Sequence, residues 1–171
     1  MGTRIGRRPS AHINPQKERI MEQNDQTEHL KDIAKQYFRA VDAGDPGVLD
    51  LFTDDAQMFY PKFGYARGKA QIGAFAQGLG RGVPLLEHEI DDFVYIAAGS
   101  RVVVEGAEHG TTATGVTFPD GVSSFGLFCN VFEFHGDLIS RVHIYVDPDF
   151  ASTHVDGVTW GQSVQSAIAA L

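Results

Sequence analysis

The sequence contains a single cysteine, Cys129, among its 171 residues. One thiol excludes an intramolecular disulfide and any CxxC metal site. No continuous apolar run approaches the length of about 20 residues that a membrane-spanning helix needs. The basic residues near the start are not followed by the apolar stretch of a secretory signal peptide. We therefore expect a cytoplasmic protein with no membrane partner.

Positive charge is also scarce. The chain has 14 Lys and Arg residues against 22 Asp and Glu residues, a formal net charge of −8. Because nucleic-acid binding depends on neutralising phosphates with Lys and Arg, this balance argues against a nucleic-acid partner. Hydrophobic residues make up 43% of the chain, an ordinary share for a globular protein, and the length suits one domain with a substantial core.

The motifs of nucleotide, acyl-serine and metal chemistry are missing as well. The segment "GLGRG" at residues 78–82 follows a predicted helix rather than opening one, so it does not fit a phosphate-binding loop. The sequence has no GxSxG elbow and no HExxH motif. His88, Glu105, His109 and His143 have no short ligand spacing that would indicate a metal site. We expect neither a cofactor nor a metal.

Residues 1–24 differ in charge from the remainder, with five basic and two acidic residues. The segment has little apolar content, and chain termini are often poorly ordered. We interpret it as a flexible tail, or as a sequence whose native start is Met21. The other interpretation is a swapped or partner-binding arm.

Two helices are predicted next. Asp25 and Glu28 have the spacing of a capping box, which starts a helix near residue 26. Gly44 suits the position just after the end of that helix. Asp45 then caps a short second helix, with Pro46 at its first position. The apolar residues that recur at helical spacing on the first helix are Leu30, Ile33, Ala34, Tyr37, Phe38 and Val41.

The remainder is read as one strand, a third helix and a run of strands. The pattern changes to period two over residues 56–60, and a helix fits residues 69–79. From Pro84 onward the alternation predicts four long strands, the first over residues 85–98. This order predicts an α+β fold, in which three N-terminal helices cover one face of a curved antiparallel sheet. In residues 151–171, the spacing of Trp160, Val164, Ile168 and Leu171 predicts a last helix with one apolar stripe.

Two parts of the chain resemble a known family. They are "QYFRAVDAGDPGVLDLFTDDAQMFYP" followed by "ARGKAQIGAF", and the later "VFEFHGDLISRVHIYVDPDF". In order and spacing they resemble the nuclear transport factor 2-like superfamily, and within it the SnoaL-like and ketosteroid-isomerase-like branch. The resemblance covers residues 27–150, and we place the domain at residues 25–150. It implies a cone-shaped fold, with a sheet wrapped around the helices and a mostly apolar pocket on the concave face.

The resemblance also implies roles for single residues. In ketosteroid isomerases, a Tyr on the first helix and an acid on the penultimate strand donate hydrogen bonds to the substrate oxyanion. The matching positions here hold Tyr37 and Asn130. The position of the isomerases' Asp base holds Tyr60, so the carboxylate base of steroid isomerisation is missing.

His88 is the strongest candidate for moving protons. Leu86 and Ile90 on its strand face are apolar, so we expect it to be buried, and burial favours the neutral, basic form. Scytalone dehydratase, a relative on the same fold, carries a His, a Tyr and an Asp at places similar to His88, Tyr60 and Asp42. That similarity implies an elimination of water without a cofactor, with Asp42 orienting His88.

The last strand offers a further group. Similarity to SnoaL-type polyketide cyclases implies that Asp147 acts as an acid or base, on one face with His143 and Tyr145. The opposite face of this strand is aliphatic, so the polar face lies either in the pocket or in solvent. A buried Glu is costly unless it is paired, so Glu105 is either exposed or functional.

The chain has 12 phenylalanines, and their abundance indicates an apolar or aromatic ligand. We assign substrate contacts to five residues, which are Tyr145, His143, Glu105, Phe128 and Phe59. We expect a cofactor-independent lyase or isomerase that acts by acid–base proton transfer, in a dehydration, isomerisation, aldol-type cyclisation or C–C cleavage. The alternative is a non-catalytic ligand-binding or dimerisation module. Resembled proteins often pair through the other sheet face, so we also expect a homodimer.

Overall fold

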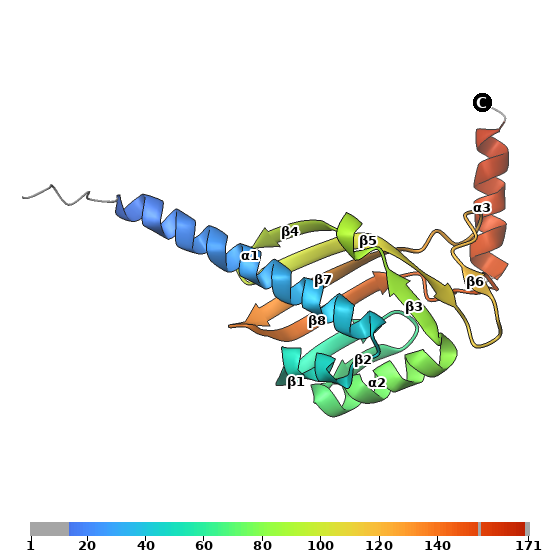
Figure 1. Ribbon diagram of the computed structural model, residues 1–171. Coiled ribbons are helices and arrows are strands. Elements are labelled where there is room, and N and C mark those ends of the chain that lie inside the picture. The colour runs from blue at the N-terminus through green and yellow to red at the C-terminus, as the bar shows by residue number, and fades with distance from the viewer. Residues whose placement is uncertain (1–13, 154, 170–171) are drawn as a thin grey trace, which may run out of the picture.

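The computed structural model describes residues 14–153 and 155–169, and in them helices lie against one curved sheet (Figure 1). The helical elements are α1 (Pro15–Asp42), the 3-10 helix η1 (Pro46–Leu51), α2 (Gly68–Gly82), the 3-10 helix η2 (Ile90–Asp92) and α3 (Val155–Ile168). The strands are β1 (Phe52–Tyr60), β2 (Gly64–Arg67), β3 (Leu85–His88), β4 (Val94–Ala98), β5 (Arg101–Thr111), β6 (Thr117–Phe118), β7 (Leu127–His135) and β8 (Leu138–Val146).

The sheet has eight strands in the order β2-β1-β8-β7-β5-β3, with β4 and β6 also paired to β5. This confirms the α+β class and the curved sheet. One pair differs from the expected antiparallel arrangement, because β1 and β8 run parallel. These two strands come from opposite ends of the domain and share no connecting turn, so no local signal in the sequence sets their relative direction.

Helix α1 begins earlier than the capping box predicted. The Asn14 side chain accepts a hydrogen bond from the Gln16 backbone N–H at 3.0 Å, and Pro15 occupies the first helical position. This earlier cap is satisfied, and the intervening residues are good helix formers, so residues 15–24 belong to α1 rather than to a tail. Residues 1–13 of the expected tail lie outside the described residues. Figure 1 shows the first half of α1 extending past the sheet.

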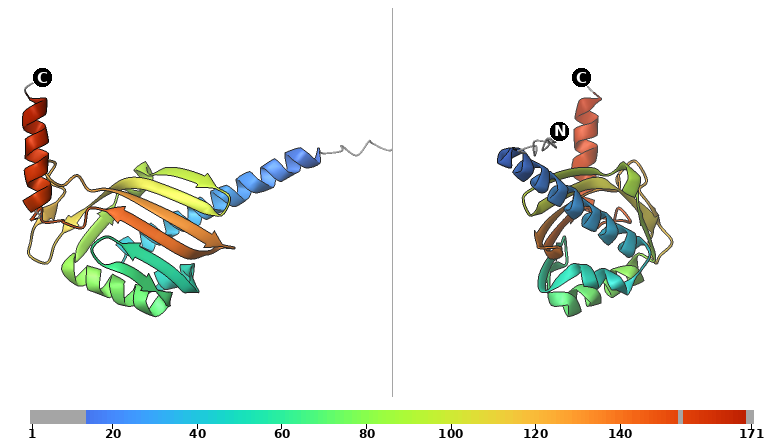
Figure 2. Two further views of the ribbon diagram at one scale, coloured as in Figure 1. Left: turned by 180° about the vertical axis from the view of Figure 1, so that it is seen from behind. Right: turned by 60° about the vertical axis from the view of Figure 1, so that its left-hand side comes forward.

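The core forms where the second half of α1 crosses the concave face of the sheet. Leu30, Ala34 and Phe38 are buried along one stripe of the helix. The Phe38 ring makes edge-on contacts with Phe93 at 4.7 Å and with Phe132 at 6.0 Å between ring centroids. Viewed from behind, β5, β7 and β8 face the viewer and α1 lies beyond them (Figure 2). The opposite face of these strands is therefore convex.

The turn after α1 follows the predicted chemistry. Gly44 adopts a positive φ of 61°, a conformation that favours glycine. Asp45 caps the next element by accepting a hydrogen bond from the Gly47 N–H at 2.8 Å, with Pro46 at the first position. That element is a 3-10 helix of six residues rather than an α-helix. The tight turn leaves Asp42 at the end of α1, facing β3.

The predicted strand over residues 85–98 is wrong in one respect. The 3-10 helix η2 divides it into β3 and β4. Side chains that a single period-two pattern would place on one face therefore lie on opposite faces of the sheet. His88 points to the concave side, whereas Val94 and Ile96 are 57% and 64% exposed on the convex side. Three residues of 3-10 helix change the alternation, so a single period-two pattern could not hold across both parts.

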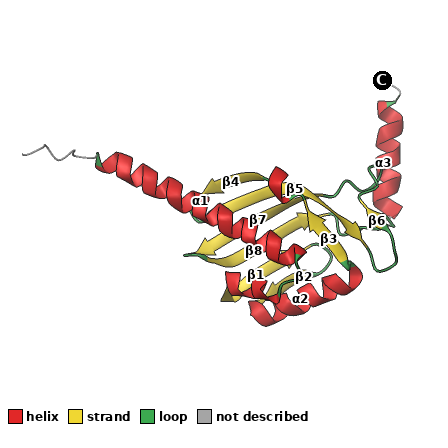
Figure 3. Cartoon of the chain, viewed as in Figure 1, coloured by secondary structure: helices red, strands yellow, loops and turns green. Residues whose placement is uncertain are grey.

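The expected C-terminal helix is present as α3, which stands apart from the sheet in the secondary-structure view (Figure 3). Val164 and Ile168 are 36% and 55% exposed, so these members of the predicted apolar stripe do not pack on the domain. The side chain of Trp160 and residue Leu171 lie outside the described residues. In the described ranges, no helix has both the length and the apolar character to cross a membrane.

Removal of residues 1–20 should leave stability nearly unchanged, because the described side chains at 16–26 are exposed and bury no apolar surface. We expect the melting temperature of the shortened chain to stay within about 3 °C of the full chain, measured by circular dichroism. Leu30→Ala is the matched control in the same helix, because Leu30 is 2% exposed. It should cost about 2–5 kcal/mol. A large loss on truncation would show that the start of the chain is packed.

Candidate active site

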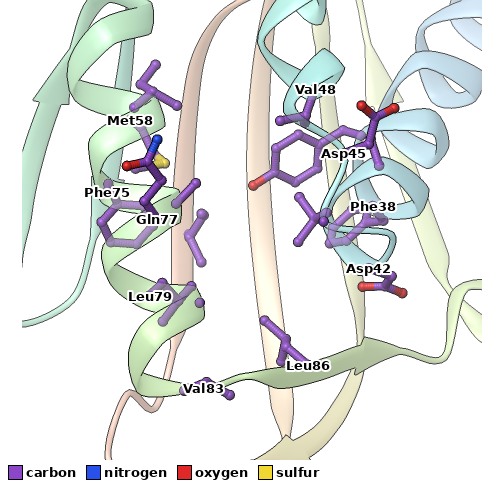
Figure 4. A pocket seen from close by; sticks show the side chains of 18 of the residues that line it. Phe38, Asp42, Asp45, Val48, Met58, Phe75, Gln77, Leu79, Val83 and Leu86 are labelled. Carbon is purple, nitrogen blue, oxygen red and sulfur yellow. The ribbon is translucent and has the colours of Figure 1, made fainter. Parts of the chain in front are cut away.

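A cavity of about 450 Å³ opens between α2, the end of α1 with η1, and β3. Figure 4 shows Phe75 and Leu79 from α2 on one side of it, Phe38 and Asp42 from α1 on the other, and Leu86 of β3 at its edge. Most of the lining side chains are apolar. The cavity is therefore suited to a small, largely apolar molecule.

Six residues predicted from the sequence meet in this cavity. Tyr37 and Asp42 come from α1, Tyr60 from β1, His88 from β3, and the pair Phe128 and Asn130 from β7. They converge because the concave face of the sheet and the facing side of α1 enclose the same space.

Asp42 holds His88 by two hydrogen bonds. Its Oδ1 atom lies 2.5 Å from His88 Nδ1, and its Oδ2 atom accepts from the His88 backbone N–H at 3.0 Å. The His88 side chain is only 7% exposed. Its ring is also packed edge-on against Phe38, with centroids 4.9 Å apart, and against Phe128, at 5.3 Å. The imidazole is thus fixed in position, and Nδ1 is occupied.

Glu108 was not predicted, yet it faces the other nitrogen of the same imidazole. His88 and Glu108 are direct cross-strand partners of β3 and β5, and Glu108 Oε2 lies 3.5 Å from His88 Nε2. Glu108 is 6% exposed and lines the cavity. The signal was present in the alternation of β5, because Glu108 shares a face with the buried Val102 and Val104.

The pKa of His88 shifts in the opposite direction from the one expected. Burial lowers the pKa of His88, but hydrogen bonding and the negative charges of Asp42 and Glu108 outweigh it and raise the pKa above its ordinary value. The prediction of a neutral base considered burial with one carboxylate partner. Two carboxylates surround the ring, so the structure favours the imidazolium, which is an acid.

Tyr37 and Tyr60 are each 8% exposed. Burial raises the pKa of both phenols well above the ordinary value, and the charge of Glu108 raises both further. Both hydroxyls therefore stay protonated and are able to donate hydrogen bonds into the cavity.

The SnoaL-like domain family matches residues 34–142 of the chain. This chain belongs to that family. The matched segment contains all six predicted residues that line the cavity, and Glu108 with them. No protein of curated function matches the sequence.

Solved structures of the same fold agree with this assignment. The chain is similar to two proteins named "putative polyketide cyclase", from Xanthomonas campestris pv. campestris and Pseudomonas putida KT2440. The first has 20% identity and a TM-score of 0.61, and the alignment covers 74% of this chain and 98% of the other. The second has 23% identity and a TM-score of 0.59, with 72% and 95% covered. TerC, crystallised with polyporic acid, has 18% identity and a TM-score of 0.59, with 70% and 92% covered.

The SnoaL-like domain does not bring its last-strand polar face into the cavity. His143 and Tyr145 lie on the convex side, and Tyr145 is 50% exposed. Asp147 follows the end of β8 and is exposed. The aliphatic face of β8 is the buried one, and its Ile144 lines the cavity. The Asp147 carboxylate accepts a hydrogen bond from the Asp149 backbone N–H at 3.0 Å, and its charge contributes to raising the pKa of Tyr60. The polar face therefore lies outside the cavity, so the predicted substrate contacts of His143 and Tyr145 are wrong, and Asp147 is not among the cavity-lining residues.

Two further predicted contacts also face outward. Glu105 is exposed on the convex side of β5, since it lies one residue from the buried Val104. Phe59 packs on the same side against Tyr65 and His143, with centroids 5.2 Å and 5.6 Å apart. Both follow the two-residue period of their strands. Across the described part of the chain, no three His, Cys, Asp or Glu side chains are grouped as metal ligands.

Asp42→Asn should lower the pKa of His88, because it weakens the hydrogen bond and removes the charge that hold the imidazolium. The folded pKa of His88 lies above its ordinary value, so its stabilising effect is complete below about pH 6.5 and is lost as the pH rises through the folded pKa. We expect the variant to lose about 1–3 kcal/mol at acidic pH. NMR titration of the imidazole signals and thermal unfolding at several pH values measure both effects.

Asp45→Asn is the matched control, because Asp45 lies at the rim of the cavity, exposed, and caps η1 instead. Its His88 titration should equal that of the unchanged chain. An unaltered His88 titration in Asp42→Asn would contradict the role of Asp42 in raising the pKa of His88.

Proposed function

We propose that this SnoaL-like domain is a cofactor-independent lyase or isomerase that moves protons within a small apolar or aromatic substrate. The observation that carries the proposal is the imidazole of His88, fixed by Asp42 at one nitrogen and facing Glu108 at the other, in a mostly apolar cavity. A titratable group with a perturbed pKa in such a cavity is typical of an enzyme.

Dehydration of a β-hydroxy ketone illustrates the chemistry. The Glu108 carboxylate takes a proton from the carbon beside the carbonyl, and a C=C bond forms as the C–O bond breaks. His88 Nε2 gives its proton to the departing hydroxyl group, which leaves as water. The proton on Glu108 then returns to His88 across the 3.5 Å gap, which restores both groups. The same pair serves an isomerisation, in which the proton returns to another carbon.

Tyr37, Tyr60 and Asn130 supply hydrogen bonds to the carbonyl oxygen in this scheme. The phenols stay protonated, so they donate to oxygen as negative charge develops on it. The naming of similar structures as polyketide cyclases supports a carbonyl-containing substrate, since aldol-type cyclisation needs the same acid–base steps.

His88→Gln should keep the fold and lower turnover by about 10²–10⁴, the share of a positioned acid–base group. The probe is 4-hydroxy-4-phenylbutan-2-one, an uncharged aryl hydroxy ketone whose loss of water gives a conjugated ketone followed by ultraviolet absorbance. His109→Gln is the control on β5, since the His109 side chain is 46% exposed and lies outside the cavity. It should leave the rate unchanged.

A lower melting temperature with unchanged turnover in His88→Gln would instead identify a core histidine. That outcome would refute the catalytic role of His88. A chain that binds the probe without turning it over would instead be the non-catalytic ligand-binding module that the sequence left as an alternative.

We also propose that two copies pair through the convex face of the sheet. Tyr65, Tyr145 and Ile96 are 51%, 50% and 64% exposed there, and Phe59 joins the two tyrosines in one aromatic cluster. A second copy would cover these apolar groups. From the sequence, we also propose a cytoplasmic location.

Sedimentation at micromolar concentration should give about twice the 18.6 kDa of one chain. Tyr145→Glu should shift the mass toward the monomer, because a charge replaces an apolar contact. Val122→Glu, at a position 83% exposed in the loop before β7, should keep the dimer. A monomer mass for the unchanged chain would refute the pairing.

A further inference from the structure

Carboxylates outnumber cationic groups around the cavity. Asp42, Asp45 and Glu108 line it, and none of the described lining residues is a Lys or Arg. His88 is the single cationic group of this lining, and it faces two of the three carboxylates. With His88 protonated the lining still carries net negative charge. An anion entering this largely apolar space would meet repulsion that solvent screens weakly.

Two buried acceptors in the cavity lining have no partner. Glu108 and Asn130 are 6% and 2% exposed, and the Oε1 atom of the first and the Oδ1 atom of the second have no hydrogen-bond partner. They lie apart on the sheet, because Asn130 pairs with Val104, and Phe128 lies between Asn130 and the position opposite Glu108. Buried acceptors without donors are unfavourable, so a ligand that brings an O–H or N–H donor gains a hydrogen bond at these atoms.

The pKa values of the two cavity tyrosines also respond to this negative charge. The negative charge of Glu108 raises the pKa of both Tyr37 and Tyr60, in addition to the effect of burial. A phenol or carboxylic acid bound beside them would experience this charge as well, and its ionised form would be disfavoured.

We propose that the cavity selects apolar molecules that are uncharged or cationic and carry an O–H or N–H donor, and that it rejects carboxylates and phenolates of the same shape. Glu108 determines this selectivity. The inference deepens the proposed function, because it states the substrate class of the same site.

A matched set of probes tests the selectivity by calorimetric titration at pH 7.5. 2-Phenylethanol is an uncharged donor, 2-phenylethylamine is a cationic donor, phenylacetate is an anion, and phenylacetone is uncharged without a donor. The alcohol and the amine should bind at least ten-fold more tightly than phenylacetate, and the alcohol more tightly than the ketone.

Glu108→Gln should reduce the ratio of amine to phenylacetate affinity at least ten-fold, because the amide keeps the shape and removes the charge. Glu105→Gln is the control on the same strand, exposed on the convex face, and should leave the ratio unchanged. Equal or tighter binding of phenylacetate, an unchanged ratio in Glu108→Gln, or no binding of any probe would overturn the proposal. Binding is measured here without turnover, so the two proposals can fail separately. If the probes bind with this selectivity but the hydroxy ketone is not turned over, the protein is a selective binding module.

Discussion

The architecture of the site depends on the contact between Asp42 and His88. One carboxylate at the end of α1 binds both the ring and the backbone of the last residue of β3. The contact joins a helix to a strand 46 residues further along the chain. It fixes the imidazole, so that Nε2 is directed to Glu108 and the free space beyond lies between α1 and α2.

This contact is better explained by function than by stability. Two carboxylates and an imidazole are costly to bury, and an apolar replacement of similar volume is often equally stable. Here the cluster lies within an aromatic core in which Phe38 and Phe128 touch the His88 ring. The low polarity around it strengthens each charge interaction, which raises the pKa of His88 and of both tyrosines. The consequence is an imidazole with a raised pKa that faces the Glu108 carboxylate.

The residues of the site were partly accessible from the sequence. Tyr37, Tyr60 and Asn130 were located by their place in the family resemblance, and His88 by its apolar strand neighbours. Glu108 was not predicted, although its alternation with Val102 and Val104 places it on the buried face of β5, opposite to Glu105. The residues on β8 could not be assigned, because a strand with one polar and one aliphatic face fits either orientation relative to the pocket.

The sequence by itself determined most of the element types, the turn at Gly44 and Asp45, and which residues of an unbroken strand share a face. These follow from local chemistry: glycine at positive φ, side-chain caps, and the two periods of helix and strand. Only the tertiary structure decided which face of each strand is concave, that β1 and β8 run parallel, and that two carboxylates meet one imidazole. Those outcomes depend on pairing between distant segments, such as Asp42 with His88 and His88 with Glu108, and local sequence does not encode the distance between them.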